Sequence, residues 1–170
     1  MVWHFSEDPT IREFLPRAGT PGAPTETMVW AIDDDHAPAY WFPRECPRVT
    51  FWRGRLQSSA LGDALLTGVT AQRVHAVEWA WLDRIRCATV YRYAFDASDF
   101  EPWTRAGGHY VTPETVRPLY IEPLGDLLAL HAEAAIELRL LPTIWPLVDS
   151  VQDSGLGFSI IRARNALPRG

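Results

Sequence analysis

The sequence predicts a single α+β domain over residues 1–170, built around a mixed or mostly antiparallel sheet with a few short helices. Three observations support this fold class. The length of 170 residues and the apolar content of 47% are enough for one sizeable core. Short segments with the two-residue period of β-strands recur along the chain, and segments with a helical period are few and scattered.

The first strand is predicted at Val2–Ser6. Alternation places His4 and Ser6 on one face of this strand, and Trp3 and Phe5 on the other. The remaining strands are predicted from runs rich in β-branched and aromatic residues, or from clean alternation. They are Met28–Ile32, Arg48–Trp52, Thr89–Phe95, His109–Thr112, Val116–Ile121, Ile136–Leu140 and Phe158–Arg162.

Three segments have helical character. Asp34–Phe42 begins with acidic residues, which favour a helix N-terminus, and its Pro38 is tolerated only in a first turn. Thr70–Arg86 has apolar residues close to helical spacing, although its first part, Val74–Trp79, is equally compatible with a strand. Leu124–Ala134 has the strongest helical pattern. Loops are expected at Arg17–Thr27, Arg53–Thr70 and Asp96–Gly108, where glycine, proline and small polar residues gather.

Composition excludes several classes of function. Sixteen basic against 21 acidic residues give a net charge of −5, so a global polyanion-binding surface is not expected. The chain has no lysine, which excludes Schiff-base chemistry and a phosphate-loop lysine. No apolar run approaches the roughly 20 residues that span a bilayer. The start, MVWHFSEDPT, lacks the features of a secretion signal, so we expect a cytoplasmic protein without a membrane partner.

Metal chemistry is not expected from the sequence. The five histidines, at positions 4, 36, 75, 109 and 131, show no metal-ligand spacing, and the two cysteines cannot form a four-thiolate site. Cys46, between Arg44 and Arg48, is interpreted as a buried inert thiol. The alternative is a reactive thiol whose pKa is lowered by the two arginines. The Asp33–Asp35 triplet favours a helix N-terminus over a divalent-cation site.

The candidate site combines the first strand with the helix that follows the second. His4 and Ser6 can point into one cleft, and Tyr40 supplies an aromatic platform. An imidazole, a hydroxyl and a phenol suit a ligand that has a ribose and a flat ring. A core histidine, a strand serine and a buried tyrosine would give the same pattern, so a purely structural role stays open.

Three segments, WHFSED, VWAIDDDHAPAYWFPRECPRVTFW and GFSIIRARNA, resemble an uncharacterised bacterial family of unknown function across nearly the whole chain. A more distant similarity is to ADP-ribosyltransferase-fold enzymes, especially the rifamycin ADP-ribosyltransferases. Their first strand, Tyr-His-Gly-Thr, stands where His4-Phe5-Ser6 stands here, and their next strand enters a helix with a tyrosine, as at Tyr40. Their strand RIYIVEP resembles Thr89–Ala94 with the following FEPW, and their YRSREPLRI resembles residues 110–118 in register.

This resemblance implies an ADP-ribosyltransferase-like split sheet that binds NAD as a substrate and transfers ADP-ribose to an unknown acceptor. His4 and Ser6 would hold the ribose and the amide, and Tyr40 would stack on nicotinamide. Candidate partners of the diphosphate are Arg12, Arg17, Arg44 and Arg48, of which Arg17 and Arg44 are preferred. The catalytic acid would be Glu101 or Glu114, or Glu78 if its segment is a strand that lines the cleft. Such an acid stabilises the positive charge that develops on the ribose.

Two other functions are consistent with the same residues. One is a non-catalytic binding or regulatory domain on the same scaffold. The other is a hydrolase or phosphotransferase that uses His4 or His109 as a general acid–base. Eight tryptophans make a homodimer a reasonable expectation. The transferase hypothesis requires His4 and Tyr40 to converge on one solvent-accessible pocket.

Overall fold

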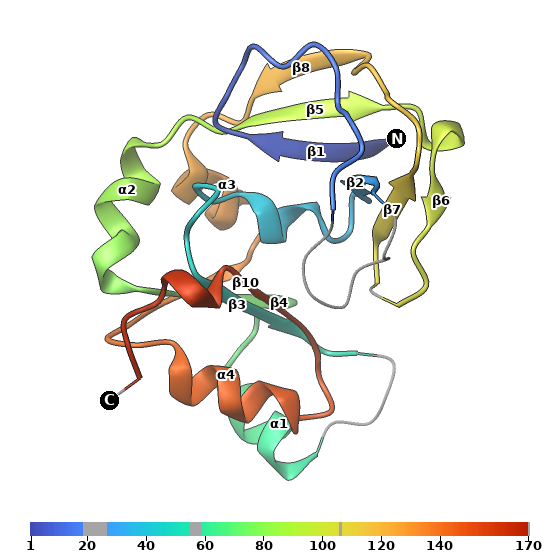
Figure 1. Ribbon diagram of the computed structural model, residues 1–170. Helices are drawn as coiled ribbons and strands as arrows, with labels where there is room; N and C mark the ends of the chain where they lie inside the picture. The colour runs from blue at the N-terminus through green and yellow to red at the C-terminus, as the bar shows by residue number, and fades with distance from the viewer. Residues whose placement is uncertain (19–26, 55–58, 106, 170) are drawn as a thin grey trace. The chain divides into compact units, whose positions relative to one another are not determined.

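The computed structural model describes residues 1–18, 27–54, 59–105 and 107–169 (Figure 1). The chain forms two compact units, one of Met1–Arg44 with Thr89–Gly125 and the other of Glu45–Ala88 with Asp126–Gly170. The first contains a six-stranded sheet and the second a four-stranded sheet, with a few short helices, so the α+β class is confirmed. Because two compact units can belong to one domain, the single-domain interpretation stays a prediction.

The six-stranded sheet is antiparallel, in the order β6-β7-β2-β1-β5-β8. Its strands are β1 (Val2–Ser6), β2 (Val29–Ile32), β5 (Tyr91–Phe95), β6 (Glu101–Pro102), β7 (His109–Thr112) and β8 (Tyr120–Pro123). Two short 3-10 helices, η1 (Ala37–Tyr40) and η3 (Ala97–Asp99), belong to the same unit. β1 pairs with β5 along its whole length, but it pairs with β2 only at Trp3 and Ile32.

The two faces of this sheet have different coverings. Residues 7–17, here called the strap, run from the end of β1 and are fastened by the Phe14–Val116 bridge. Phe14 packs in one cluster with Val2 and Tyr93, and we call this side the strap face. On the other side, called the η1 face, Trp3, Ile32 and Ala94 pack against Ala37 of η1.

The four-stranded sheet has the order β10-β3-β4-β9, in which only the β4–β9 pair is parallel. Its strands are β3 (Arg48–Trp52), β4 (Arg73–Glu78), β9 (Glu137–Leu141) and β10 (Gly157–Ile161). The helices of this unit are α1 (Ala60–Leu65), η2 (Trp79–Trp81), α2 (Leu82–Cys87), α3 (Leu127–Glu133), α4 (Trp145–Gln152) and η4 (Ala163–Asn165). Residues Phe51, Val74 and Val151 are completely buried in its hydrophobic core.

Most predicted strands are confirmed, and Val2–Ser6, Arg48–Trp52 and His109–Thr112 have the predicted limits. The prediction for Val116–Ile121 is wrong in position, because β8 starts only at Tyr120. Pro118 has no N–H to donate to a ladder, which explains why the strand begins after it. The loop expected at Asp96–Gly108 contains η3 and β6.

The helical predictions need three corrections. The helix expected at Asp34–Phe42 is the single 3-10 turn η1, with Pro38 near its start. Thr70–Arg86 divides into β4, η2 and α2, so the strand alternative for its first part is confirmed. The helices α1 and α4 were not predicted, and α1 lies inside the expected loop Arg53–Thr70, of which residues 55–58 are outside the described part. The loop predicted at Arg17–Thr27 lies mostly outside the described residues.

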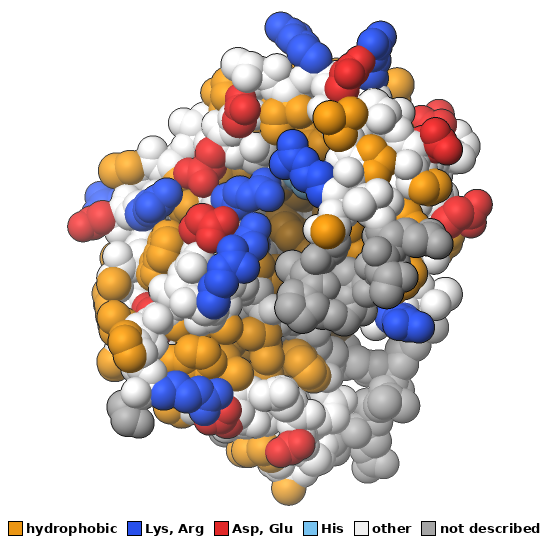
Figure 2. Space-filling model, in the orientation of Figure 1, with side chains coloured by type: hydrophobic (Ala, Val, Ile, Leu, Met, Phe, Trp, Pro, Cys, Tyr) orange, Lys and Arg blue, Asp and Glu red, His pale blue; other side chains and the backbone are white. Residues whose placement is uncertain are grey.

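No helix among the described residues is both long and apolar enough to span a membrane. On the face drawn in Figure 2, arginine and acidic side chains are interspersed with apolar ones. Charge of a single sign does not cover this face, in agreement with the small net charge of −5.

Candidate functional site

His4 lies on β1 and points to the strap face. Its Nδ1 is 2.9 Å from the Trp30 carbonyl oxygen, and because a carbonyl only accepts, Nδ1 carries the proton and donates. The ring meets Phe14 edge-on, with 4.8 Å between centroids. Burial lowers the pKa of His4 to about 4, and the nearby Arg44 and Arg17 lower it further, against the bond to Trp30, which raises it. His4 is therefore neutral at pH 7.

Tyr40 lies on the other side of the sheet. Its ring stacks on Phe5, at 5.9 Å between centroids and 9° between planes, and Phe5 alternates with His4 along β1. The structure thus places His4 and Tyr40 on opposite faces of the strand. The prediction that they converge on one pocket is wrong, because η1 packs against the face that carries Trp3 and Phe5.

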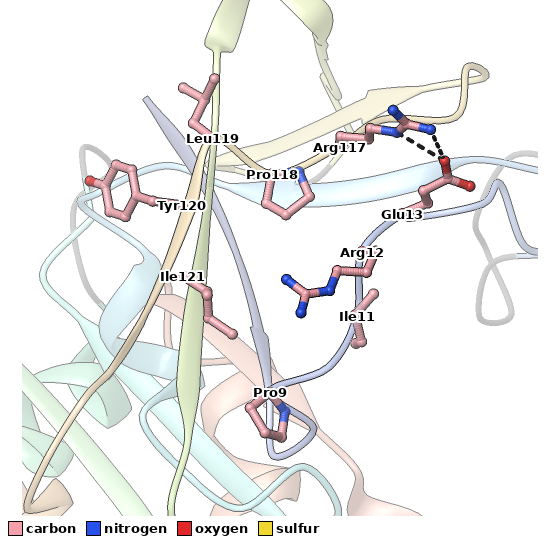
Figure 3. Close-up of a pocket in the computed structure, with 9 residues that line it drawn as sticks. All are labelled: Pro9, Ile11, Arg12, Glu13, Arg117, Pro118, Leu119, Tyr120 and Ile121. Carbon is pink, nitrogen blue, oxygen red and sulfur yellow. Dashed lines mark hydrogen bonds and ion pairs between the residues drawn. The ribbon is translucent and has the colours of Figure 1, made fainter.

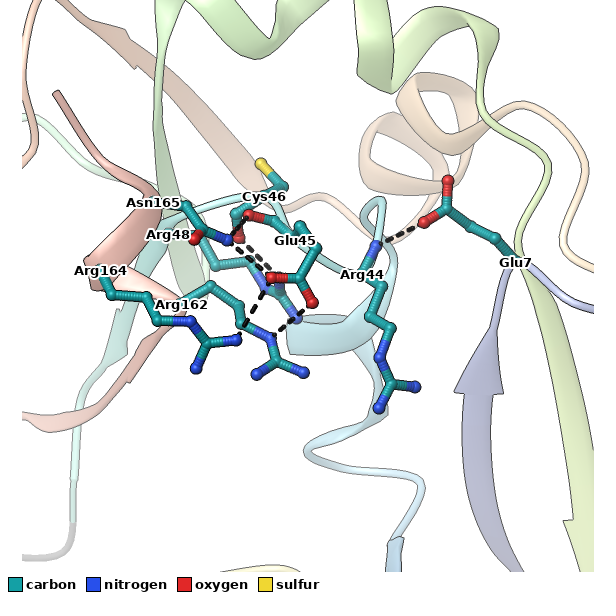
Figure 4. Close-up of polar contacts among 8 residues, drawn as sticks. All are labelled: Glu7, Arg44, Glu45, Cys46, Arg48, Arg162, Arg164 and Asn165. Carbon is teal, nitrogen blue, oxygen red and sulfur yellow. Dashed lines mark hydrogen bonds and ion pairs between the residues drawn. The ribbon is translucent and has the colours of Figure 1, made fainter. Parts of the chain in front are cut away.

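The other residues assigned to NAD binding have local structural roles. The Ser6 hydroxyl accepts a hydrogen bond from the Asp8 amide at 3.1 Å, which turns the chain into the strap. Arg17 forms a backbone bridge with Met28. The Arg44 amide donates to the Glu7 carboxylate at 3.0 Å (Figure 4). These contacts use the backbone of both arginines, so they do not test a role of the guanidinium groups toward a ligand.

The candidate acids do not lie beside His4. Glu101 is on the edge strand β6, three strands from β1, which corresponds to roughly 14 Å at the usual strand spacing. Glu114 is exposed, and its amide bonds to the Thr112 hydroxyl. Glu78 is on a strand, but it is only 1% exposed and accepts from the backbone amides of Ile144 and Leu167. It stabilises the second unit instead of lining a cleft.

A chain of hydrogen bonds on the η1 face connects His109 with Tyr40. The Gly107 carbonyl lies 3.1 Å from Nδ1 of His109, so Nδ1 donates to it, and Nε2 accepts from the Tyr40 hydroxyl at 3.0 Å. Nearby, the His36 ring bonds to Asp33 at 2.7 Å and lies against the Gly108 backbone. A fixed imidazole bonded to a phenol is a suitable general-base arrangement, and an acid–base role for His109 stays a prediction.

Among the residues that the structure describes, no group of three or more His, Cys, Asp and Glu side chains is arranged to hold a metal ion. His75 and His131 meet in the core of the second unit, 2.9 Å apart. His131 donates through Nδ1 to the Leu127 carbonyl, so its Nε2 accepts from His75. Burial lowers the pKa of both imidazoles.

Cys46 is completely buried, as predicted. Burial raises the pKa of its thiol to about 12, and this effect exceeds the opposite influence of Arg48. The adjacent Glu45 is an ion-pair centre of the second unit, where Arg162 and Arg164 approach its carboxylate and Asn165 donates to it (Figure 4). Both arginines pair with this one carboxylate, so we assign the cluster a structural role in holding η4.

An open cavity of the first unit lies between the strap and β8 (Figure 3). We call it the strap groove. Its volume is about 410 Å³, which is within the range of small-ligand sites. Its lining consists of Pro9, Ile11, Arg12, Glu13, Arg117, Pro118, Leu119, Tyr120 and Ile121. Six of these are apolar or aromatic, and Ile11 and Ile121 continue into the hydrophobic cluster of the strap face.

The charged side chains of the groove differ in whether they have an ion-pair partner. Arg117 forms an ion pair with Glu13, which neutralises both at one end. Figure 3 shows the Arg12 guanidinium projecting from the strap toward Ile121, between the apolar walls. None of the described carboxylates forms an ion pair with Arg12. An anionic group in the groove would therefore find a planar donor that has no acidic partner among the described residues.

Sequence reasoning named Arg12 only as one of several arginines that could bind a diphosphate, and it missed the groove. Leu119 and Tyr120, directly after Pro118, are the signal that it overlooked. They are 61% and 47% exposed, and neighbouring exposed large apolar residues often mark an interaction site. The path of the strap, which brings Arg12 opposite them, had no signature in the sequence.

Comparison with known proteins places the chain in a family whose function is unknown. Neither the curated proteins nor the solved structures gave a match to this chain. The model of a family of unknown function, DUF6886, matches residues 3–166. This match covers nearly all of both compact units, so the chain belongs to the DUF6886 family.

Proposed function

We propose that the protein is a binding domain, and that its strap groove takes an apolar ligand segment that carries a carboxylate. One observation carries this proposal: the Arg12 guanidinium, without an acidic partner among the described residues, projects between apolar walls. The walls supply affinity by removing apolar surface from water, and the guanidinium supplies selectivity through a charge-assisted bond. No step of bond breaking is needed for this function.

The test uses a simple aryl carboxylate, 4-phenylbutyrate, titrated into ¹⁵N-labelled protein. We expect shifts of the amide resonances of Ile11, Arg12 and Ile121. Arg12→Gln should weaken binding at least tenfold, because a hydrogen bond to a charged group contributes about 1.5–3 kcal/mol. Arg86→Gln removes an equal charge from α2 in the other unit and should leave binding unchanged. Equal binding by the Arg12 and Arg86 variants would contradict the proposal.

NAD remains a prediction of the sequence resemblance, as does the likeness to an ADP-ribosyltransferase-like split sheet. The divergence of β1 from β2, where His4 bridges to Trp30, is consistent with such a split. The opposite placement of His4 and Tyr40 removes the geometric basis for transfer by that pair. We therefore expect that His4 and Tyr40 do not hold NAD together, so that any rise of the thermal unfolding midpoint caused by NAD persists in the His4→Ala variant. A rise that His4→Ala abolishes would show that this expectation is wrong.

A further inference from the structure

The six-stranded sheet has two edges of different character. At one edge, β6 has only two residues, Glu101 and Pro102, and this short length discourages further pairing. At the other edge, β8 has four residues and pairs only with β5 among the described strands. The strap groove lies along β8, so the edge that remains suitable for pairing is also the one beside the cavity.

The ladder between β5 and β8 determines which backbone groups face outward. The Leu124 amide donates to the Val90 carbonyl at 2.8 Å, just beyond the pair Tyr91 and Pro123. Hydrogen-bonded and non-hydrogen-bonded pairs alternate in an antiparallel ladder, so Glu122 and Tyr120 bond to β5. The N–H and C=O groups of Ile121, which lies between them, therefore point away from β5, toward the open edge.

The side chain of Ile121 shows on which face of the sheet the side chain of a partner residue would lie. Ile121 is paired with Tyr93 and packs in the same cluster, so it lies on the strap face. A residue paired with Ile121 across the edge would have its side chain on this same face, because directly opposed residues share a side. Figure 3 shows the Arg12 guanidinium on this side of the strand, opposite Ile121.

We propose that β8 accepts an extended peptide segment of a partner protein as a seventh strand, with an acidic side chain of that segment paired with Arg12. The inference rests on the proposed function of the groove and names its ligand. Backbone bonds to Ile121 supply affinity, as in other additions of a strand to a sheet edge. Charge complementarity selects the acidic residue. Because side chains alternate along a strand, the residues two positions before and after it would lie along the apolar walls.

The probe is the peptide acetyl-Thr-Ile-Thr-Glu-Thr-Ile-Thr-amide with a fluorescent label, measured by fluorescence polarisation. Two matched peptides carry Gln in place of the central Glu, or an N-methyl group on the amide of that residue. We expect each change to weaken binding at least tenfold. Arg12→Gln should weaken the acidic peptide and leave the Gln peptide unaffected, and Arg86→Gln should change neither. Bound peptide should slow hydrogen exchange of the Ile121 amide at least tenfold.

The outcomes separate this inference from the proposed function. Equal binding of the N-methylated peptide, or unchanged exchange at Ile121, overturns strand addition, while dependence on Arg12 keeps the groove as a binding site. Binding of 4-phenylbutyrate without binding of any peptide overturns only the peptide inference. Failure of both probes overturns the two proposals together.

Discussion

Lowering the pH from 7 to 4 is expected to destabilise the protein by several kcal/mol through its buried imidazoles. Burial lowers the pKa values of His4, His75 and His131 below the ordinary value of 6.5. As the pH falls, the unfolded chain takes up these protons first. The stabilisation is therefore complete above about pH 6.5 and is lost as the pH falls toward the folded-state pKa values.

His4 alone sets the scale of this effect. A pKa of about 4 in the folded state corresponds to a loss of about 3 kcal/mol once the pH is below 4, most of it between pH 6.5 and pH 4. Urea unfolding at pH 7 and pH 5 measures the change. His4→Gln keeps a donor for the Trp30 carbonyl and should remove about 2 kcal/mol of the difference between the two pH values. An unchanged difference in this variant would contradict the placement of His4.

Gly108→Ala is expected to reduce the free energy of unfolding by about 3 kcal/mol. The residue has φ +76°, and an added Cβ would lie 2.2 Å from Nδ1 and 2.4 Å from Cγ of His36. The imidazole cannot move aside cheaply, because Asp33 holds both its Nδ1 and its backbone amide. The clash therefore affects a fixed ring and adds to the backbone strain.

The matched control is Gly125→Ala. Gly125 has φ +80°, and an added Cβ would have no neighbour within 4 Å, so this variant shows the backbone cost alone, about 1 kcal/mol. The double variant Gly108→Ala/His36→Ala should recover part of the loss, because it removes the clashing ring. Chemical unfolding of the four proteins measures these terms. Equal losses for Gly108→Ala and Gly125→Ala would show that the His36 ring does not lie against Gly108.

Local patterns predicted the strands well, since alternation and β-branched content depend on neighbouring residues only. Alternation also separated His4 from Phe5 correctly, but it could not indicate which face of the sheet η1 would cover. That choice depends on how Ala37 packs against Ile32 and Ala94, which are far apart in the sequence. The prediction of a shared pocket for His4 and Tyr40 failed at this step.

The strap groove could not be predicted from the sequence for a related reason. Arg12 and Ile121 are 109 positions apart, and they meet because Phe14 fastens the strap beside Val116. The parallel pairing of β4 with β9 is equally non-local, and neither strand carries a mark of its partner. Hydrophobic periodicity indicates whether an element is a helix or a strand and which side of it is buried. The identity of its neighbours follows from packing over the whole chain.

The central position of β1 has a consequence for biosynthesis. During synthesis β1 leaves the ribosome before β5, with which it pairs along its whole length and which follows some ninety residues later. The second unit likewise awaits β9 and β10, near the carboxyl terminus. Nascent β1 therefore lacks its main partner until β5 has also been translated, which gives slow, high-contact-order folding and a need for protection against aggregation during synthesis.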